Sequence, residues 1–151
     1  MRSKYLFKQA WTWPKEVRSW FEERIVGTCL HVCSGRSTLG DVLVDIEPQL
    51  KGVLQGDILT RTGAFEVLGQ FDTVLMDPPF NWDYPRRYNA TYNLVKHLRP
   101  GGVFLQNAPW IPFHHELVDP EIWIRMPRTL NYMNMVALFK ARRRSTLHSS
   151  R

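Results

Sequence analysis

The sequence has little of two things that would place it outside the cytoplasm: cysteine and long hydrophobic runs. It contains only two cysteines, Cys29 and Cys33, among 151 residues. On one extended strand, at about 3.3 Å per residue, they would lie too far apart to form a disulfide. The longest apolar run, Met135 to Phe139, has five residues, whereas a membrane-spanning helix needs about 20. The N-terminus also lacks the apolar core of a secretory signal, so we expect a cytoplasmic protein with no membrane partner.

The chain also lacks the length for a second domain of ordinary size. Its 44% hydrophobic and 23% charged residues are typical of one folded domain, which we expect to span residues 1–141. The net charge is +6, but residues 140–151 carry five basic residues and no acidic one. We therefore expect residues 142–151 to form a basic tail, either a phosphate-binding segment or an ordinary solvated chain end.

Hydrophobic patterning predicts an α/β fold built around a mostly parallel sheet. The apolar strands are nearly continuous rather than alternating, as in sheets that are covered on both faces. Strands are expected at 28–33, 42–46, 53–58, 71–76 and 103–106, a C-terminal β pair at 122–126 and 133–141, and helices at 14–26 and 86–98. The C-terminal strand should run antiparallel to the others.

Two crossovers in this sheet are too short to hold a helix. Only six residues separate Gly35 from Val42, and six separate Ile46 from Val53, whereas a helical crossover usually takes about 10–12. Both missing helices would lie on one face of the sheet, and a bare apolar face is unusual in a monomer. We therefore expect a homodimer, with cover by N-terminal aromatic residues as the alternative. Those residues are Tyr5, Phe7, Trp11 and Trp13, which could also stack on bases but better suit core cover, because aromatic side chains dominate packing.

The strongest chemical signal follows the predicted strand 71–76, where Asp77, Pro78, Pro79 and Phe80 stand in succession. Open α/β sheets bind ligands outside the carboxyl ends of their strands. Two consecutive prolines give a stiff loop that offers carbonyl oxygens and a carboxylate but lacks two N–H donors. Such a loop suits an exocyclic amine, and an aromatic ring beside it can stack on a base. A plain strand-to-loop turn is the alternative without function.

The tetrapeptide resembles the signature of class I S-adenosylmethionine-dependent methyltransferases that methylate an exocyclic amino group of a base, as the N6-adenine enzymes do. In that family an Asp, Asn or Ser, two prolines and an aromatic residue follow the fourth strand. The resemblance implies that Asp77 and the carbonyl of Pro78 hold the amine and that Phe80 stacks on the base. Pro79, the second of the stiff pair, completes the predicted catalytic loop. It also implies a Rossmann-like methyltransferase fold, here with reduced helices, and S-adenosylmethionine as the cofactor.

The first cofactor motif of this family is a strand that ends in a Gly-rich turn. Missing side chains there let the backbone approach the cofactor. The motif corresponds to Cys33, Ser34 and Gly35, with only one of the usual glycines, and His31 stands where the family often has an acid. The resemblance implies that the three turn residues contact the cofactor.

The second and third cofactor motifs each place an acidic residue after a strand. Asp45 matches the acid after strand two that binds both ribose hydroxyls, since a carboxylate accepts two hydrogen bonds. Asp57 matches the acid after strand three that meets the adenine amine. An isoleucine follows each acid, so the implied cofactor site also includes Ile46 and Ile58.

Cysteine and histidine alternate on the first predicted strand, at Cys29, His31 and Cys33. These side chains would share a face, and both residue types bind zinc. A fourth ligand is not evident, however, and small thiols are common in buried strands. We expect no metal site, and we expect His114 and His115 to be solvated loop residues.

Aromatic and basic residues follow the predicted catalytic loop, at Tyr84, Arg86, Arg87 and Tyr88. They suit the guiding of a nucleic acid strand, and they equally suit the polar start of a helix. Both interpretations stay open.

Together these motifs predict an S-adenosylmethionine-dependent N-methyltransferase that acts on an exocyclic amine of a nucleobase, with adenine in DNA favoured. The chain has no room for a target-recognition domain, so an RNA base is the first alternative. A catalytically silent module of the same fold, binding nucleic acid or a partner, is the second; the sparse glycines favour it and the intact tetrapeptide opposes it. A small-molecule methyltransferase is disfavoured because it would not need the amine-binding tetrapeptide.

Overall fold

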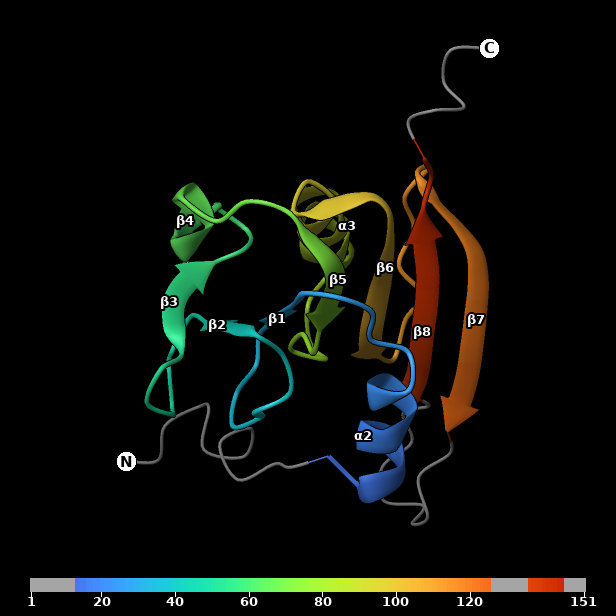
Figure 1. Ribbon diagram of the computed structural model, residues 1–151, viewed down its shortest axis with the longest axis horizontal. Coiled ribbons are helices and arrows are strands. Elements are labelled where there is room, and N and C mark those ends of the chain that lie inside the picture. Colours follow the sequence, from blue (N-terminus) through green and yellow to red (C-terminus); the bar gives the residue numbers. More distant parts are fainter. Residues whose placement is uncertain (1–12, 126–135, 146–151) are drawn as a thin grey trace.

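The computed structural model describes residues 13–125 and 136–145, which form one eight-stranded sheet with α2 in front of it and α3 behind it (Figure 1). The elements are Lys15–Glu22 (α2), Cys29–Val32 (β1), Val42–Asp45 (β2), Leu54–Asp57 (β3), Thr62–Gly63 (β4), the short 3₁₀ helix Ala64–Glu66 (η1), Phe71–Met76 (β5), Tyr84–Val95 (α3), Leu98–Ala108 (β6), Leu117–Arg125 (β7) and Val136–Arg143 (β8). The strands are ordered β4-β3-β2-β1-β5-β6-β8-β7. In these two ranges no helix is long and apolar enough to cross a membrane.

The sheet is mostly parallel, as the sequence predicts. β1 pairs in parallel with β2 and β5, β2 with β3, and β5 with β6. The C-terminal strand β8 is antiparallel to both β6 and β7, which confirms the expected direction of that strand. Parallel strands end on the same side, so the residues after β1, β2, β3, β5 and β6 lie along one edge, which we call the site edge. The strand order reverses between β1 and β5, the position where open α/β sheets bind ligands.

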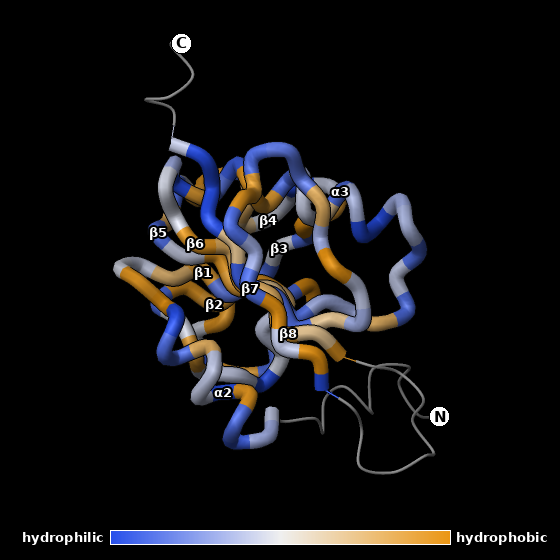
Figure 2. Tube along the Cα trace, turned by 90° about the vertical axis from the view of Figure 1, so that its right-hand side faces the viewer, coloured by the Kyte–Doolittle hydropathy of each residue, from blue (hydrophilic) through white to orange (hydrophobic). Residues whose placement is uncertain are grey.

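Each face of the sheet has its own hydrophobic core, because the central strands are buried on both sides. Val74 and Leu75 are consecutive residues of β5, both fully buried, and they belong to different cores. α3 contributes Ala90 and Leu94 to one core, and α2 contributes Phe21 to the other. Figure 2 shows the central strands as largely hydrophobic and many of the turns as hydrophilic. Burial of each large apolar side chain contributes about 1.5–3 kcal/mol.

The two short crossovers contain no helix, in agreement with the prediction from their length. Instead, the loop between β1 and β2 folds back over β1, where the carbonyl of Leu39 lies 2.8 Å from Nδ1 of His31. The ring of Trp13 stacks on the His31 ring with 5.4 Å between centroids. His31 is thereby fully buried. Trp13 thus serves as cover for the sheet, while Tyr5, Phe7 and Trp11 lie outside the described residues.

A third crossover, residues 109–116 between β6 and β7, also lacks a helix. The segment runs beside α3: the guanidinium carbon of Arg87 lies 4.3 Å from the centroid of the Trp110 ring. Further along, the rings of Tyr92 and His114 are 5.6 Å apart. An irregular segment therefore lies alongside α3 where a crossover helix would pack. β7 begins directly after it, at Leu117 rather than at 122.

β6 begins at Leu98, earlier than the expected start at 103. Leu98 pairs with Phe71, and Val103 pairs with Thr73, so the register shifts across Arg99–Gly102. Four residues of β6 therefore oppose one of β5, and the strand bends there instead of starting there. The preceding helix correspondingly ends at Val95, not at 98.

The sheet also extends past the boundary expected at residue 141. β8 continues to Arg143, so Arg142 and Arg143, expected in the basic tail, are strand residues. Nη2 of Arg142 lies 2.7 Å from Oδ2 of Asp119, and Nε of Arg143 lies 3.0 Å from Oε1 of Glu116. Two of the tail's positive charges are therefore neutralised within the domain.

Candidate functional site

The loop Asp77–Phe80 lies at the middle of the site edge. The backbone N–H of Asp77 donates to the carbonyl of Val32 over 3.2 Å, so the ends of β5 and β1 are adjacent. Pro78 is buried, which fixes the loop against the domain. Phe80 is 38% exposed, so part of its ring is available for contact with a ligand.

Among the described residues, Trp13 and Asn107 donate hydrogen bonds to the carboxylate of Asp77 from other parts of the chain. Nε1 of Trp13 donates to Oδ2 over 3.0 Å, and Nδ2 of Asn107 donates to Oδ1 over 3.2 Å. Because an ionised carboxylate only accepts hydrogen bonds, Asp77 fixes which way the Asn107 amide points.

The amide oxygen of Asn107 is a further acceptor beside this carboxylate. Asn107 is only 4% exposed, and its Oδ1 has no hydrogen-bond partner among the described residues. A buried carbonyl without a partner costs about 1–3 kcal/mol. The carboxylate of Asp77 and the amide oxygen of Asn107 give the site edge a pair of adjacent acceptors suited to an N–H-bearing ligand.

The turn Cys33–Gly35 is tied to Asp45 at the same edge. Gly35 N–H donates to Oδ2 of Asp45 over 2.8 Å, and Glu47 N–H donates to Oδ1 over 2.9 Å. Cys33 and Gly35 have φ of 57° and 56°, the left-handed region that glycine adopts without strain. A side chain at Gly35 would meet nothing within 4 Å, so open space adjoins the turn. The hydroxyl of Ser34 is buried and has no hydrogen-bond partner in the described part of the chain.

These features fit a cofactor that brings hydroxyl and amino groups. The turn offers backbone beside open space, Ser34 offers an unsatisfied hydroxyl, and Asp45 offers a carboxylate fixed by two backbone N–H groups. Ile46 follows Asp45 and is 50% exposed, so it adds an apolar surface next to the carboxylate.

The third predicted motif is only partly presented at the site edge. Oδ1 of Asp57 accepts the N–H of Leu59 over 2.9 Å, which orders the turn after β3. Ile58 is 3% exposed and packs in the core beneath α3, and its carbonyl accepts from Nδ2 of Asn93 over 2.8 Å. The Ile58 side chain therefore faces the core, unlike that of Ile46.

Two residues of the site were not anticipated. Asn107 could have been found from the sequence, because it directly follows the predicted strand 103–106. That strand is parallel to the strand before Asp77, so both residues are placed at the same edge of the sheet. Trp13 could not have been found in this way, because its contact with Asp77 joins positions 64 residues apart and depends on how α2 packs on the sheet.

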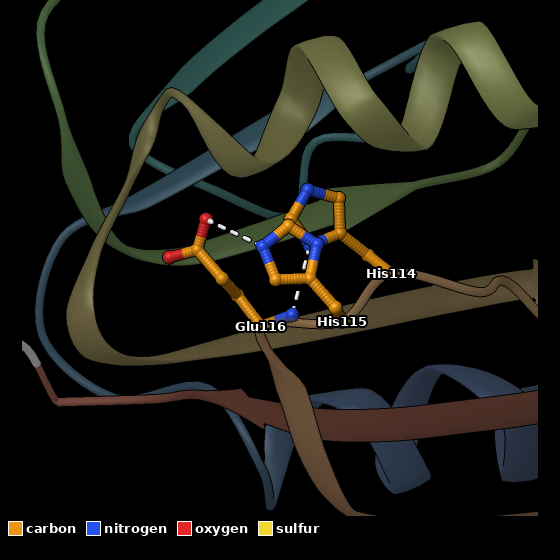
Figure 3. Close-up of side chains that lie close together, drawn as sticks. All are labelled: His114, His115 and Glu116. Atoms are coloured by element: carbon orange, nitrogen blue, oxygen red, sulfur yellow. Dashed lines mark hydrogen bonds and ion pairs between the residues drawn. The ribbon is translucent and has the colours of Figure 1, made fainter. Parts of the chain in front are cut away.

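His114, His115 and Glu116 form a separate cluster, with one ligand atom of each within 4.8 Å of the others (Figure 3). The expectation that His114 is solvated is wrong, since it is 8% exposed beside Tyr92, whereas His115 is exposed as predicted. Nδ1 of His114 accepts the N–H of Glu116 over 3.0 Å, and Glu116 is paired with Arg143. Burial and, secondly, His115 hold the pKa of His114 below its usual value. Because these partners occupy one imidazole nitrogen and the carboxylate, the cluster is better suited to ring stacking than to metal binding.

The two cysteines should differ sharply in reactivity. Burial and, secondly, the charge of Asp41 raise the pKa of the Cys29 thiol to about 12, while Cys33 is half-buried in the candidate cofactor turn. The thiolate is the reactive form, so iodoacetamide at pH 8 should modify Cys33 and leave Cys29 unmodified, as peptide mass spectrometry would show. Both should react in denaturant, and preferential modification of Cys29 in the folded protein would contradict the assignment.

Several solved methyltransferase structures have the same fold. N-methyltransferase NodS from Bradyrhizobium japonicum WM9, solved with S-adenosyl-L-homocysteine, superimposes with a TM-score of 0.61 at 13% identity, over 85% of this chain and 84% of that chain. TrmN from Thermus thermophilus gives 0.59 at 13% identity, over 78% of this chain but 44% of that chain. The putative methyltransferase YhhF from Escherichia coli gives 0.54 at 13% identity, over 87% and 84%. The chain therefore has the Rossmann-like class I methyltransferase fold, as predicted. No family model and no curated protein sequence matches the chain.

Proposed function

We propose that this protein is an S-adenosylmethionine-dependent N-methyltransferase that acts on an exocyclic amine of a nucleobase, with adenine in DNA as the favoured substrate. The observation that carries the proposal is the pair of acceptors at Asp77 and Asn107, beside the proline loop that the resemblance assigns to the amine. It lies on the same edge of a methyltransferase fold as the turn tied to Asp45.

The cofactor would be held by the turn and the acids of the site edge. S-adenosylmethionine supplies an electrophilic methyl group carried on a sulfonium sulfur. The backbone of Cys33–Gly35 would contact its amino-acid part, Asp45 its ribose hydroxyls, and Ile46 with Asp57 its base. The open space beside Gly35 and the unsatisfied hydroxyl of Ser34 support this assignment.

The acceptor group explains how the chain would activate a poor nucleophile. The lone pair of an exocyclic amine is delocalised into the aromatic ring. Hydrogen bonds from its two N–H groups to the Asp77 carboxylate and the Pro78 carbonyl draw the nitrogen toward tetrahedral geometry, which restores the lone pair. Trp13 and Asn107 position that carboxylate. Catalysis is then mainly orientation and electrostatic stabilisation.

The exposed ring of Phe80 favours a base over a smaller amine substrate. Stacking of a base on an aromatic ring contributes about 1–3 kcal/mol. A target within a duplex must be flipped out at a cost of a few kcal/mol, which this stacking can offset. An RNA base presents the same amine and remains the alternative.

The proposal is tested by supplying methyl-labelled cofactor with separate DNA and RNA pools and analysing the nucleosides. We expect label on the exocyclic amine of deoxyadenosine. Label only in the RNA pool would select the alternative substrate. If neither pool is labelled, the protein lacks this activity, and the result favours a catalytically silent module of the same fold.

Asp45→Ala should weaken binding of S-adenosylhomocysteine by about 5- to 150-fold, which corresponds to about 1–3 kcal/mol for the loss of a charged hydrogen-bond acceptor. Titration calorimetry measures this directly. Glu47→Ala is the matched control, because Glu47 lies in the same turn and contributes its backbone rather than its carboxylate. If wild type and Asp45→Ala bind S-adenosylhomocysteine with equal affinity, the assignment of the cofactor to the end of β2 is wrong.

We also expect the protein to form a homodimer, although the apolar surface left for a second copy is smaller than the sequence indicated. Trp13 and Leu39 already cover β1 within one chain. Leu54 on β3 is still 44% exposed, so a second copy has an uncovered part of the sheet to bury.

A further inference from the structure

The outward face of α3 carries a row of tyrosines that the core does not use. Tyr84, Tyr88 and Tyr92 are spaced by four residues, so they lie on one side of the helix. They are 73%, 45% and 44% exposed. The opposite side of α3 supplies the buried residues Ala90, Thr91, Leu94 and Val95. The tyrosine row is therefore not explained by packing.

The row continues onto the neighbouring crossover segment. The rings of Tyr88 and Tyr92 are stacked 6.2 Å apart, and the Tyr92 ring lies 5.6 Å from that of His114. His114 in turn stacks on His115 at 4.6 Å (Figure 3). We call Tyr84, Tyr88, Tyr92 and the exposed His115 the aromatic track; His114, only 8% exposed, packs between Tyr92 and His115 and joins them. It spans two segments separated in sequence, so it is a feature of the folded surface.

The aromatic track starts beside the proposed catalytic loop. α3 begins four residues after Phe80, with Asp83 as its N-cap. It follows the carboxyl end of β5, so its first turn lies at the site edge and the helix leads away from it. Eight residues of helix from Tyr84 to Tyr92 span about 12 Å, a length that about three stacked nucleotides cover at 3.4 Å each.

The charges around the aromatic track are predominantly positive. Residues 84–97 contain Arg86, Arg87 and Lys96 and no acid. Nζ of Lys96 lies 4.9 Å from the centroid of the Tyr92 ring, and Arg144 donates to the carbonyl of His115 at the far end. The nearby acids Asp83 and Glu116 are paired with Arg86 and Arg143, so the excess positive charge comes from Arg87, Lys96 and Arg144. A polyanion with flat, stackable groups matches this combination better than an apolar protein surface does.

We propose that the aromatic track binds the single DNA strand that carries the target base, 5′ or 3′ of the base held at Phe80. The choice of DNA rests on the proposed function. Sequence-tolerant binding of single strands uses aromatic stacking together with basic groups along the backbone, and both are present here. The track would also supply the substrate-binding surface that a chain without a recognition domain otherwise lacks.

The test is fluorescence anisotropy of a labelled ten-nucleotide single-stranded oligodeoxynucleotide, without cofactor. Tyr88→Ala and Tyr92→Ala should each weaken binding by about 5- to 150-fold, while Tyr88→Phe and Tyr92→Phe retain most of the affinity because they keep the ring. Lys96→Gln should lower the slope of log affinity against log salt by about 0.7. Trp123→Ala is the control, because Trp123 is an exposed aromatic residue on β7, 39% exposed, outside the track.

Methyl transfer to free deoxyadenosine, which is too small to reach the track, separates this inference from the proposed function. If wild type methylates free deoxyadenosine but the tyrosine variants bind the oligonucleotide as tightly as wild type, the role of the aromatic track is refuted and the proposed function stands. Track-dependent binding without any transfer would support the track and overturn the function. Tighter binding of the same sequence as RNA would overturn the choice of DNA. A tyrosine variant that dissociates a dimer in light scattering, with unchanged oligonucleotide affinity, would assign the track to a second copy of the chain instead.

Discussion

Replacing Asp77 by alanine is expected to abolish detectable methyl transfer while leaving affinity for S-adenosylhomocysteine near the wild-type value. The carboxylate is assigned to the amine, whereas the cofactor is assigned to the turn and to Asp45. Loss of one preorganised polar group at a reacting centre costs about 10²–10³ in kcat. We expect at least this loss, because the same change also removes the acceptor of the Trp13 and Asn107 hydrogen bonds and so frees both side chains to move. Transfer of labelled methyl groups and titration calorimetry on the same preparation measure the two effects.

The control for this variant is Asp83→Ala. Asp83 is an exposed carboxylate that caps α3 by accepting the N–H of Arg86 over 3.1 Å, so its loss affects the helix start and not the acceptor group. The cap costs about 1 kcal/mol, and transfer should persist. Thermal unfolding of both variants shows whether they are folded. An Asp77→Ala protein that transfers methyl groups at the wild-type rate would refute the mechanism.

The parallel sheet and the position of its functional edge were predictable because both follow from local patterns. Phe71–Met76 is an unbroken strand that ends at a proline pair, and the structure gives it the expected bounds. Once β1, β2 and β5 are parallel, their ends must share an edge. Gly35, Asp45 and Asp77 are brought to that edge for this reason, without any information on side-chain contacts.

The contacts that complete the site were not predictable in the same way. The indole of Trp13 reaches Asp77 only because α2 packs on the sheet beside β1. Ile58 was assigned to the cofactor by its place after Asp57, but it lies in the turn after β3 and packs in the same core cluster as Phe65 of η1. β4 and η1 themselves are two and three residues long, too short for any periodic pattern. β4 forms through pairing with β3, and η1 follows it directly.

The end of β8 shows how tertiary contacts redefine a basic segment. In sequence, residues 142–151 are a run of arginines and small polar residues. In the fold, the Arg143 guanidinium donates to the carbonyls of Val95 and Leu98 as well as to Glu116. It thereby satisfies the carbonyl of Val95 at the end of α3, which lacks a partner within the helix, and the carbonyl of Leu98 at the start of β6.

Two truncations should therefore behave differently. Deletion of residues 142–151 removes the end of β8 together with Arg143, so the carbonyls of Val95 and Leu98 and the Glu116 carboxylate lose the guanidinium that they bind. At about 1–3 kcal/mol for each unsatisfied group, a loss of about 3 kcal/mol is expected. It should lower the midpoint of thermal unfolding by roughly 10 °C, at about 2–4 °C per kcal/mol. Deletion of residues 146–151 keeps β8 and should leave the midpoint within about 2 °C of wild type.

The shorter truncation is also the valid test of the tail in nucleic-acid binding, because it changes charge without removing a strand. It eliminates one arginine, Arg151, so the slope of log affinity against log salt should fall by at most about 0.7–0.9.

Circular dichroism melting of both truncated proteins and of the point variant Arg143→Ala gives the decisive comparison of stability. If Arg143 ties β8 to α3, Arg143→Ala should reproduce much of the loss seen in the longer truncation. If the protein lacking residues 142–151 has the same unfolding midpoint as wild type, the domain ends at residue 141 and the last residues of β8 contribute little to stability.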